Sequence, residues 1–151
     1  MFKPILFAWI GHADLRGPLE EKEKGAGPIA QALAALSFDE AHLLHDMQAA
    51  EARDYAAWLR KRTDAWVVLH HAPLSSPVHF GEIHEAAVRV VSGVLREKGA
   101  APGTPGLDVT FHLSPGTPAM AAVWIILGKT RFPATLIESS REHGVKTAAV
   151  P

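Results

Sequence analysis

The sequence contains no cysteine at any of its 151 positions. Disulfide bonds, thiolate nucleophiles and zinc sites built on sulfur are therefore excluded. It also lacks an excess of positive charge, because 15 Lys and Arg stand against 16 Asp and Glu, for a formal net charge of −1. A surface for duplex nucleic acid needs a strong basic excess. The charge balance argues against such a surface and leaves open a small anion or a short single strand held in one pocket.

Hydrophobic runs long enough to span a bilayer are absent as well. The longest run, residues 119–128, would extend only about 15 Å as a helix, half the thickness of a bilayer core. The apolar start, MFKPILFAWIG, differs from a secretory signal because the run is short, Pro4 interrupts it, and HADLR follows in place of a small-residue cleavage site. We interpret this start as a buried first strand and expect a cytoplasmic protein without membrane contact.

The residues that are present make up an ordinary globular composition, with 48% hydrophobic and 21% charged residues. The length fits one domain with its own core, and we predict a single domain over residues 1–151. The chain stops at TAAVP without a polar tail or a closing helix. This ending favours a domain cut from a longer protein.

Strand and helix patterns alternate along the chain. Short apolar runs indicate buried strands, and amphipathic segments between them indicate helices. The predicted strands cover residues 4–10, 40–46, 65–71, 107–113 and 132–140, with a short sixth at 145–151, and the predicted helices cover 28–37, 49–63, 82–99 and 118–127. Residues 12–27, rich in Gly and charge, are predicted as a polar loop. This order predicts a three-layer αβα fold with a mainly parallel sheet of five to six strands.

In such a fold, ligands bind beyond the carboxyl ends of the strands, where the strand order reverses. The loop after the fourth strand, LSPGTP, therefore becomes a candidate site. Thr117 is suited to the N-cap of the following helix, and Gly116 permits a sharp turn and close approach of a ligand. Free backbone N–H groups and the helix dipole favour an anion there, and the Ser114 and Thr117 hydroxyls can add donors. From the residues alone, an anion cradle and a well-capped tight turn remain equally good interpretations.

The loop after the first strand is the second candidate. Gly11, His12, Asp14 and Arg16 follow that strand on the same predicted edge of the sheet as Thr117. An imidazole and a guanidinium are suited to phosphate, the latter as a bidentate partner. The alternative is a solvated loop.

Three further residues complete the predicted ligand-binding set. His71 ends the third strand, Ser75 follows it in a segment where a plain turn is the alternative, and His112 lies near the end of the fourth strand. No metal site is predicted, because no pair among the nine histidines forms a clean chelate completed by a carboxylate. No catalytic residue is predicted either, since the segment HLSPG lacks the G-x-S-x-G elbow that would make Ser114 a nucleophile.

The predicted helix 118–127 has no polar face, so both of its sides should be covered. One side can pack on the sheet. The other requires another element or a second copy of the chain, and Met120, Trp124 and Leu127 have the spacing of such a seam. Burial inside one domain is the alternative to a dimer.

Residues 108–140, DVTFHLSPGTPAMAAVWIILGKTRFPATLIESS, resemble the core motif of the CRISPR-associated Rossmann-fold (CARF) sensor superfamily. They are most similar to the amino-terminal sensor of sigma-54-dependent activators of RNA-repair operons. The shared features are a strand that ends in a His, a Gly-Thr turn, an apolar helix with a Trp, and a Pro-Ala-x-Leu-Ile-x-x-Ser strand. Ser114, Pro115 and Pro118 depart from the pattern, in which Thr and His are common.

The resemblance implies a Rossmann-like regulatory domain without a cofactor. It implies an RNA-derived phosphate ligand, either a cyclic oligoadenylate or an RNA end, bound at the interface of a homodimer. It also implies ATPase and DNA-binding modules further along the full-length chain. Two alternatives stay open: a metal-independent ring nuclease or phosphodiesterase on the same fold, and a dimerisation module without a ligand.

Overall fold

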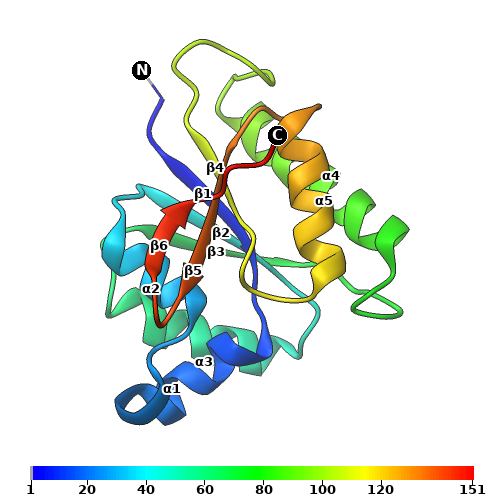
Figure 1. The fold of residues 1–151 in the computed structure, drawn as a ribbon. Coiled ribbons are helices and arrows are strands. Elements are labelled where there is room, and N and C mark those ends of the chain that lie inside the picture. The colour runs from blue at the N-terminus through cyan, green and yellow to red at the C-terminus, as the bar shows by residue number, and fades with distance from the viewer. Residues whose placement is uncertain (1) are drawn as a thin grey trace.

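A computed structural model describes residues 2–151, and for residues 21–24 it describes the backbone but not the side chains. Strands and helices alternate along most of the chain (Figure 1). The elements are β1 (Ile5–Trp9), α1 (His12–Lys24), α2 (Pro28–Ala35), β2 (Glu40–His45), α3 (Ala49–Arg60), β3 (Trp66–His71), α4 (Phe80–Glu97), β4 (Val109–His112), α5 (Pro118–Lys129), β5 (Thr135–Ser140) and β6 (Gly144–Thr147).

The six strands form one sheet in the order β3-β2-β1-β4-β5-β6. The first five are parallel, with Phe7 opposite both His42 on β2 and Phe111 on β4. The last strand, β6, pairs antiparallel with β5 through a hairpin. The α/β class and the mainly parallel six-stranded sheet confirm the fold predicted from the sequence.

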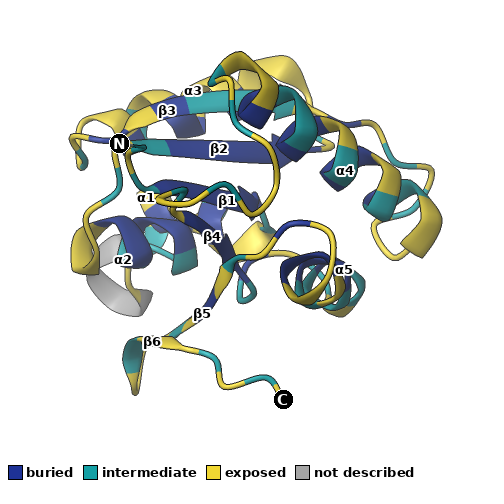
Figure 2. Ribbon diagram, turned by 90° about the horizontal axis from the view of Figure 1, so that it is seen from above, coloured by how far each residue is buried: buried dark blue, intermediate teal, exposed yellow. Residues whose placement is uncertain are grey.

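Helices cover both faces of the sheet, with α4 and α5 on one side and α1, α2 and α3 on the other (Figures 1 and 2). Alternate residues of β1 point to the two layers. Phe7 and Trp9 belong to the core under α4 and α5, whereas Leu6 and Ala8 belong to the core under α2 and α3. All five residues of β1 are buried, as expected for the central strand of a doubly covered sheet.

The prediction of a polar loop over residues 12–27 was wrong, because α1 occupies most of it. This helix has no continuous apolar stripe, and Leu19 on it is 85% exposed, so hydrophobic periodicity could not reveal it. Its start is fixed instead by a capping contact of Asp14 and by close packing of Gly17, where a Cβ atom would lie 2.1 Å from the Ala26 carbonyl oxygen.

Of the two interpretations of helix 118–127, the structure favours burial inside one domain over a seam made by Met120, Trp124 and Leu127. Met120, Trp124 and Leu127 are 5%, 0% and 1% exposed, and they fill the core between α5 and the sheet. Trp124 stacks on Phe111 with ring centroids 4.5 Å apart. The side of α5 that faces away from the sheet carries Ile126, which is 45% exposed, so an apolar face of the helix does remain uncovered, but it is a different one.

Candidate functional site

The strand order reverses between β1 and β4. From β1 the chain crosses towards β2 and β3, and from β4 it crosses towards β5. A crevice forms at the carboxyl ends of strands where such crossovers diverge. A cavity of about 420 Å³ lies at this point, and we call it the switch-point cavity. Its lining includes Trp9, Gly11, His12, Ala13, Asp46, Met47, Glu51, Leu74, Pro77, Ser114, Pro115, Gly116, Thr117 and Met120.

The loops after β1 and β4 touch in this cavity at two glycines. A Cβ atom on Gly11 would lie 2.6 Å from the backbone nitrogen of Gly116. Gly116 has φ +86°, a left-handed conformation that favours glycine, and a Cβ on it would lie 2.5 Å from the Met120 sulfur. Both positions therefore require glycine, one for the contact between the loops and the other for the turn into α5.

Two helices begin at the edge of the switch-point cavity, α1 at His12 and α5 at Pro118. The amides of a helix's first turn have no partner within the helix, and the dipole makes that end positive. Ala13 in the first turn of α1 is exposed and lines the cavity. The site thus places two helix starts beside a glycine contact, and helix N-termini favour anionic groups. At α5 the Met120 amide is already capped by the Thr117 hydroxyl and Pro118 has no N–H, so this helix offers fewer free amides than an uncapped one.

Hydrogen bonds fix the turn before α5. The Thr117 hydroxyl accepts a hydrogen bond from the Met120 amide at 3.3 Å and donates one to the Pro77 carbonyl at 2.7 Å. This hydroxyl caps the helix and ties the loop before α4 to the cavity, so its hydrogen is already in use. The Ser114 Oγ accepts a hydrogen bond from the Ser139 amide at 2.7 Å, which leaves the Ser114 hydroxyl hydrogen to donate.

Asp14 is fully buried and holds the backbone at the start of α1, next to the cavity. One carboxylate oxygen accepts from the Gly11 amide at 2.8 Å, and the other accepts from the Ile29 amide at 2.9 Å. Burial raises the pKa of Asp14 to about 6, against the lowering effect of these amides. The residue joins the start of α1 to the start of α2, and it is absent from the cavity lining. Its place is that of a positioning group, in contrast to the direct ligand contact expected from the sequence.

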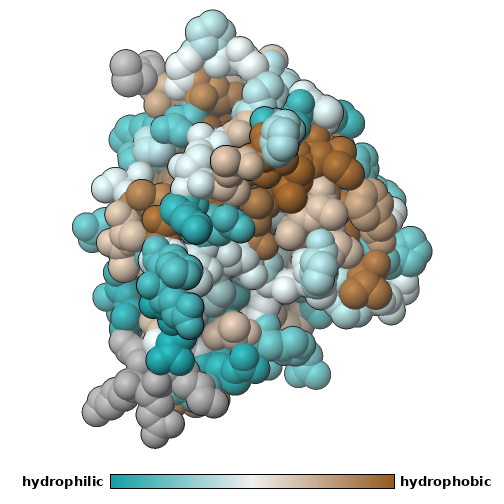
Figure 3. All heavy atoms as spheres, viewed as in Figure 1, coloured by the Kyte–Doolittle hydropathy of each residue, from teal (hydrophilic) through white to brown (hydrophobic). Residues whose placement is uncertain are grey.

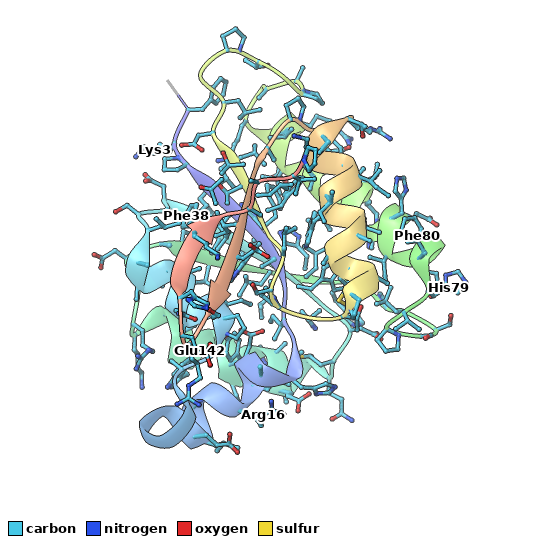
Figure 4. The ribbon with its side chains drawn as sticks, in the orientation of Figure 1. Lys3, Arg16, Phe38, His79, Phe80 and Glu142 are labelled. Atoms are coloured by element: carbon cyan, nitrogen blue, oxygen red, sulfur yellow. The ribbon has the colours of Figure 1, made fainter. Side chains whose placement is uncertain are left out.

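The other predicted residues divide into those inside and those outside the cavity. His12 lines it and is exposed. Arg16, on α1 (Figure 4), lines a neighbouring cavity of about 650 Å³ instead. His71 is exposed at the end of β3 and packs against the His45 ring, and Ser75 bonds to the Glu82 carboxylate. Neither of these two lines the switch-point cavity.

His112 ends β4 in the interior, with no exposed surface. Its Nε2 lies 2.7 Å from the Ser139 hydroxyl, and its Nδ1 has no partner among the described residues. Burial lowers the pKa of His112 to about 4, so the ring is neutral at physiological pH. The geometry makes it an internal brace between β4 and β5, without contact to the cavity.

Sequence reasoning missed the acidic wall of the cavity. Asp46 directly follows β2, and Glu51 lies in the first turn of α3. The lining contains no Lys or Arg, so these carboxylates and the backbone dipoles dominate its electrostatics. One sequence signal existed: Asp46 is the last residue of the predicted strand 40–46, at the edge of the sheet where the ligand loops gather.

A separate titratable cluster lies at the other end of β2, under α4. His42 Nδ1 is 2.9 Å from His70 Nε2, and His42 Nε2 is 2.8 Å from a Glu40 carboxylate oxygen. The other Glu40 oxygen pairs with Lys98. Burial lowers the pKa of His70 to about 4, with the neighbouring His42 adding to the effect. This cluster faces a third cavity of about 500 Å³.

No group of three His, Cys, Asp or Glu side chains with metal-binding geometry occurs in the part of the chain whose side chains are described. Within residues 2–151, no helix combines the length and hydrophobicity needed to cross a bilayer.

No protein-family model and no curated protein matches this chain. Solved structures do match it. Csm6 from Enterococcus italicus, bound to cyclic hexa-2′-fluoro-hexa-dAMP, superposes with a TM-score of 0.71 and 12% identity over 96% of this chain and 35% of its own. Can2 from Sulfobacillus thermosulfidooxidans, in complex with cyclic tetra-adenylate, gives 0.60 and 9% over 98% and 37%.

A type III CRISPR defence DNA nuclease activated by cyclic oligoadenylate gives a TM-score of 0.54 and 20% identity over 91% of this chain and 19% of its own. The chain therefore spans between 19% and 37% of these three structures. At such identities the likeness shows a shared fold. The protein is a Rossmann-like α/β protein that shares the fold of these three structures and has a cavity at its switch point.

Proposed function

We propose that this chain is a ligand-sensing regulatory domain of the CARF superfamily that binds a cyclic oligoadenylate in the switch-point cavity. The observation that carries the proposal is the meeting of two helix N-termini over the contact between Gly11 and Gly116. Backbone amides there bind an anionic group without a charged side chain. The ligands named for Csm6, Can2 and the CRISPR nuclease support the ligand class.

The charge of the cavity favours a cyclic oligoadenylate over an RNA end with a terminal phosphate. A phosphodiester carries one negative charge, whereas a terminal phosphomonoester carries nearly two at neutral pH. Asp46 and Glu51 line the cavity, and no Lys or Arg does. A doubly charged group would meet repulsion without a compensating cation, whereas a singly charged diester matches the helix ends better.

A homodimer is the second element of the proposal. A cavity of about 420 Å³ is at the small end of the range for ligand sites, so it accommodates part of an oligoadenylate ring. A second copy would enclose the remainder. Val78 and Phe80, beside the cavity wall at Pro77, are 60% and 44% exposed, and Figure 4 shows Phe80 directed outward from the start of α4. Hydrophobic surface also gathers on the side that α5 occupies (Figures 1 and 3).

We further propose that the domain is the cytoplasmic input unit of a sigma-54-dependent activator, with ATPase and DNA-binding modules beyond it. This context rests on the sequence resemblance of residues 108–140. Sequencing the gene past residue 151 tests it: an ATPase motif supports the regulator, and a nuclease domain in that place contradicts it.

A negative charge introduced at the start of α1, in the lining of the switch-point cavity, tests the binding site. Ala13→Glu puts a carboxylate at the start of α1, where the helix dipole stabilises it by about 0.3–1 kcal/mol, so the fold is retained. The same carboxylate repels a bound phosphate. Ala13→Gln has the same shape without the charge and serves as the matched control.

Calorimetric titration with cyclic tetra- and hexa-adenylate is expected to give binding to the wild type and to Ala13→Gln, and at least tenfold weaker binding to Ala13→Glu. Equal affinity of the two variants would refute the cradle. Chromatography of the ligand after incubation provides the second arm. Recovery of the intact ring supports a sensor, and cleavage would instead assign a ring nuclease.

A further inference from the structure

Asp46 and Glu51 form the acidic wall of the switch-point cavity, whose lining also includes the starts of α1 and α5. Asp46 lies at the carboxyl end of β2, and Glu51 lies in the first turn of α3. Both residues are exposed. Among the described residues, neither carboxylate forms a hydrogen bond or an ion pair with another side chain. Their oxygens are therefore free to accept hydrogen bonds from a ligand.

A carboxylate accepts hydrogen bonds and donates none. The group opposite it in a complex must therefore be a donor, because a phosphate oxygen there would be repelled. An adenylate carries two kinds of donor, the ribose 2′-hydroxyl and the amino group of adenine. The acidic wall thus requires the nucleoside part of the ligand, with the phosphate at the helix ends.

The topology selects the ribose. In sheets with the order 3-2-1-4-5-6, an acidic residue that follows the first helical crossover holds a ribose hydroxyl, while the phosphates lie at the first helix N-terminus. Asp46 occupies the corresponding place, directly after β2, which pairs with β1. The phosphate site at α1 and the carboxylate of Asp46 lie on the same cavity, so one nucleotide can reach both.

A second observation concerns a buried hydrogen-bond donor on a residue that lines the cavity. Trp9 lines it and is 1% exposed, yet its indole Nε1 has no hydrogen-bond partner among the described residues. Buried donors are nearly always paired in folded proteins. Tyr55, His112 and Trp124 also have an unpaired buried atom, but of these four residues only Trp9 belongs to the lining of the switch-point cavity.

We propose that Asp46 accepts a hydrogen bond from a ribose 2′-hydroxyl and makes the cavity selective for ribonucleotide ligands. Glu51 lies beside it in the same wall and takes a second donor of the ligand. This inference rests on the proposed function and adds a specificity-determining residue to it. The 2′-hydroxyl is the group by which a protein distinguishes RNA from DNA at a given site.

The test compares cyclic tetra- and hexa-adenylate with their 2′-fluoro-2′-deoxy counterparts, in which fluorine replaces the hydroxyl and cannot donate. Calorimetry on the complete chain gives the affinity ratio for each pair. A hydrogen bond to a charged group predicts a wild-type preference of about tenfold or more for the ribose ligand. Asp46→Ala is expected to bring the ratio close to one, mainly by weakening the ribose ligand.

Asp54→Asn is the matched control, since Asp54 is an exposed carboxylate on α3 that does not line the cavity. It is expected to keep the wild-type ratio. Thermal melting of each variant separates a structural role from recognition. A carboxylate near the start of α3 also interacts with the helix dipole, so its removal can lower stability. A loss of stability alone leaves the ratio of the affinities for the ribose and 2′-fluoro ligands unchanged.

The outcomes distinguish a failure of the inference about Asp46 from a failure of the proposed sensor function. A wild-type preference that disappears in Asp46→Ala and persists in Asp54→Asn supports the inference. An unchanged ratio in Asp46→Ala overturns the role of Asp46, and equal wild-type affinity for both ligands overturns the selectivity, while the proposed sensor function stands in both cases. Failure of the wild type to bind any of the four ligands overturns the proposed function and the inference together.

Discussion

Substitution of Gly11 by Ala tests whether contact between the two crossover loops creates the site. A Cβ atom at this position would lie 2.6 Å from the Gly116 backbone nitrogen, closer than real Cβ atoms approach other atoms. The loops must separate by roughly 0.8 Å to restore an ordinary contact. Gly11 does not have a positive φ, so the cost is steric and not conformational.

The expected cost has two parts. Forcing a methyl group into a packed contact destabilises a protein by about 1–3 kcal/mol. Replacing Gly by Ala also recovers about 0.4–1 kcal/mol by restricting the unfolded chain. The net loss in the free energy of unfolding is therefore about 1–2 kcal/mol, which leaves most of the protein folded at 25 °C.

Ligand binding should suffer more than folding, because Gly11 and Gly116 both line the proposed ligand site. We expect at least a tenfold loss of affinity for cyclic tetra-adenylate in calorimetry on the folded variant, with the unfolding free energy measured by urea titration. Gly93→Ala is the control: it lies within α4, and a Cβ there meets nothing within 4 Å. It should gain up to about 1 kcal/mol and bind normally. Wild-type affinity in Gly11→Ala would refute the reasoning.

Three further outcomes follow from the geometry. Asp14→Ala leaves the Gly11 and Ile29 amides without their partner. The free energy of unfolding, measured by urea titration, should therefore fall by about 2–4 kcal/mol. A loss below about 1 kcal/mol would contradict the structural role of Asp14. Burial lowers the pKa of His112 from 6.5 to about 4, so protonation favours the unfolded state, and stability should fall as the pH drops through this window. His112→Gln should lose less over the same window, and an identical slope in pH-dependent melting would contradict the assignment. Ile126→Asp should dissociate the proposed dimer in analytical ultracentrifugation while Leu19→Asp, a control on α1, should not, and an unaffected dimer would exclude the exposed face of α5 from the interface.

The centre of the sheet could be predicted because β1, β2 and β4 are almost entirely buried. Continuous apolar runs such as residues 4–10 are typical of strands that are covered on both faces. The five parallel strands confirm this prediction. The helix α1 could not be predicted in the same way. Its sequence, HADLRGPLEEKEK, contains Gly17 and Pro18, and it is held by the capping contact of Asp14 instead of by an apolar stripe.

The candidate site could be predicted in part. The topology rule places the loops after the first and fourth strands together, and Gly11, His12, Ser114, Gly116 and Thr117 do line one cavity. Side-chain direction was beyond the reach of the sequence. A polar residue after a strand can face the ligand or the interior, and only the fold reveals that Asp14 and His112 face inward.

The acidic wall shows the same limit, because here the sequence did not reveal two residues that do line the cavity. Asp46 and Glu51 are polar residues near the start of a helix, which is their usual position on any protein surface. Their place in the lining of the cavity became visible only in the fold. Their presence, with no Lys or Arg in the lining, favours a phosphodiester over a terminal phosphate.

The most direct measurement of the central claim is amide-resolved NMR of the chain during titration with cyclic tetra- and hexa-adenylate. Saturable shifts are expected at the amides of residues 11–13 and of the non-proline residues in 114–120, which form the two loops and helix starts of the switch-point cavity. Shifts confined to the neighbouring cavity lined by Arg16 and Arg141, or no shifts with either ring, would contradict the claim.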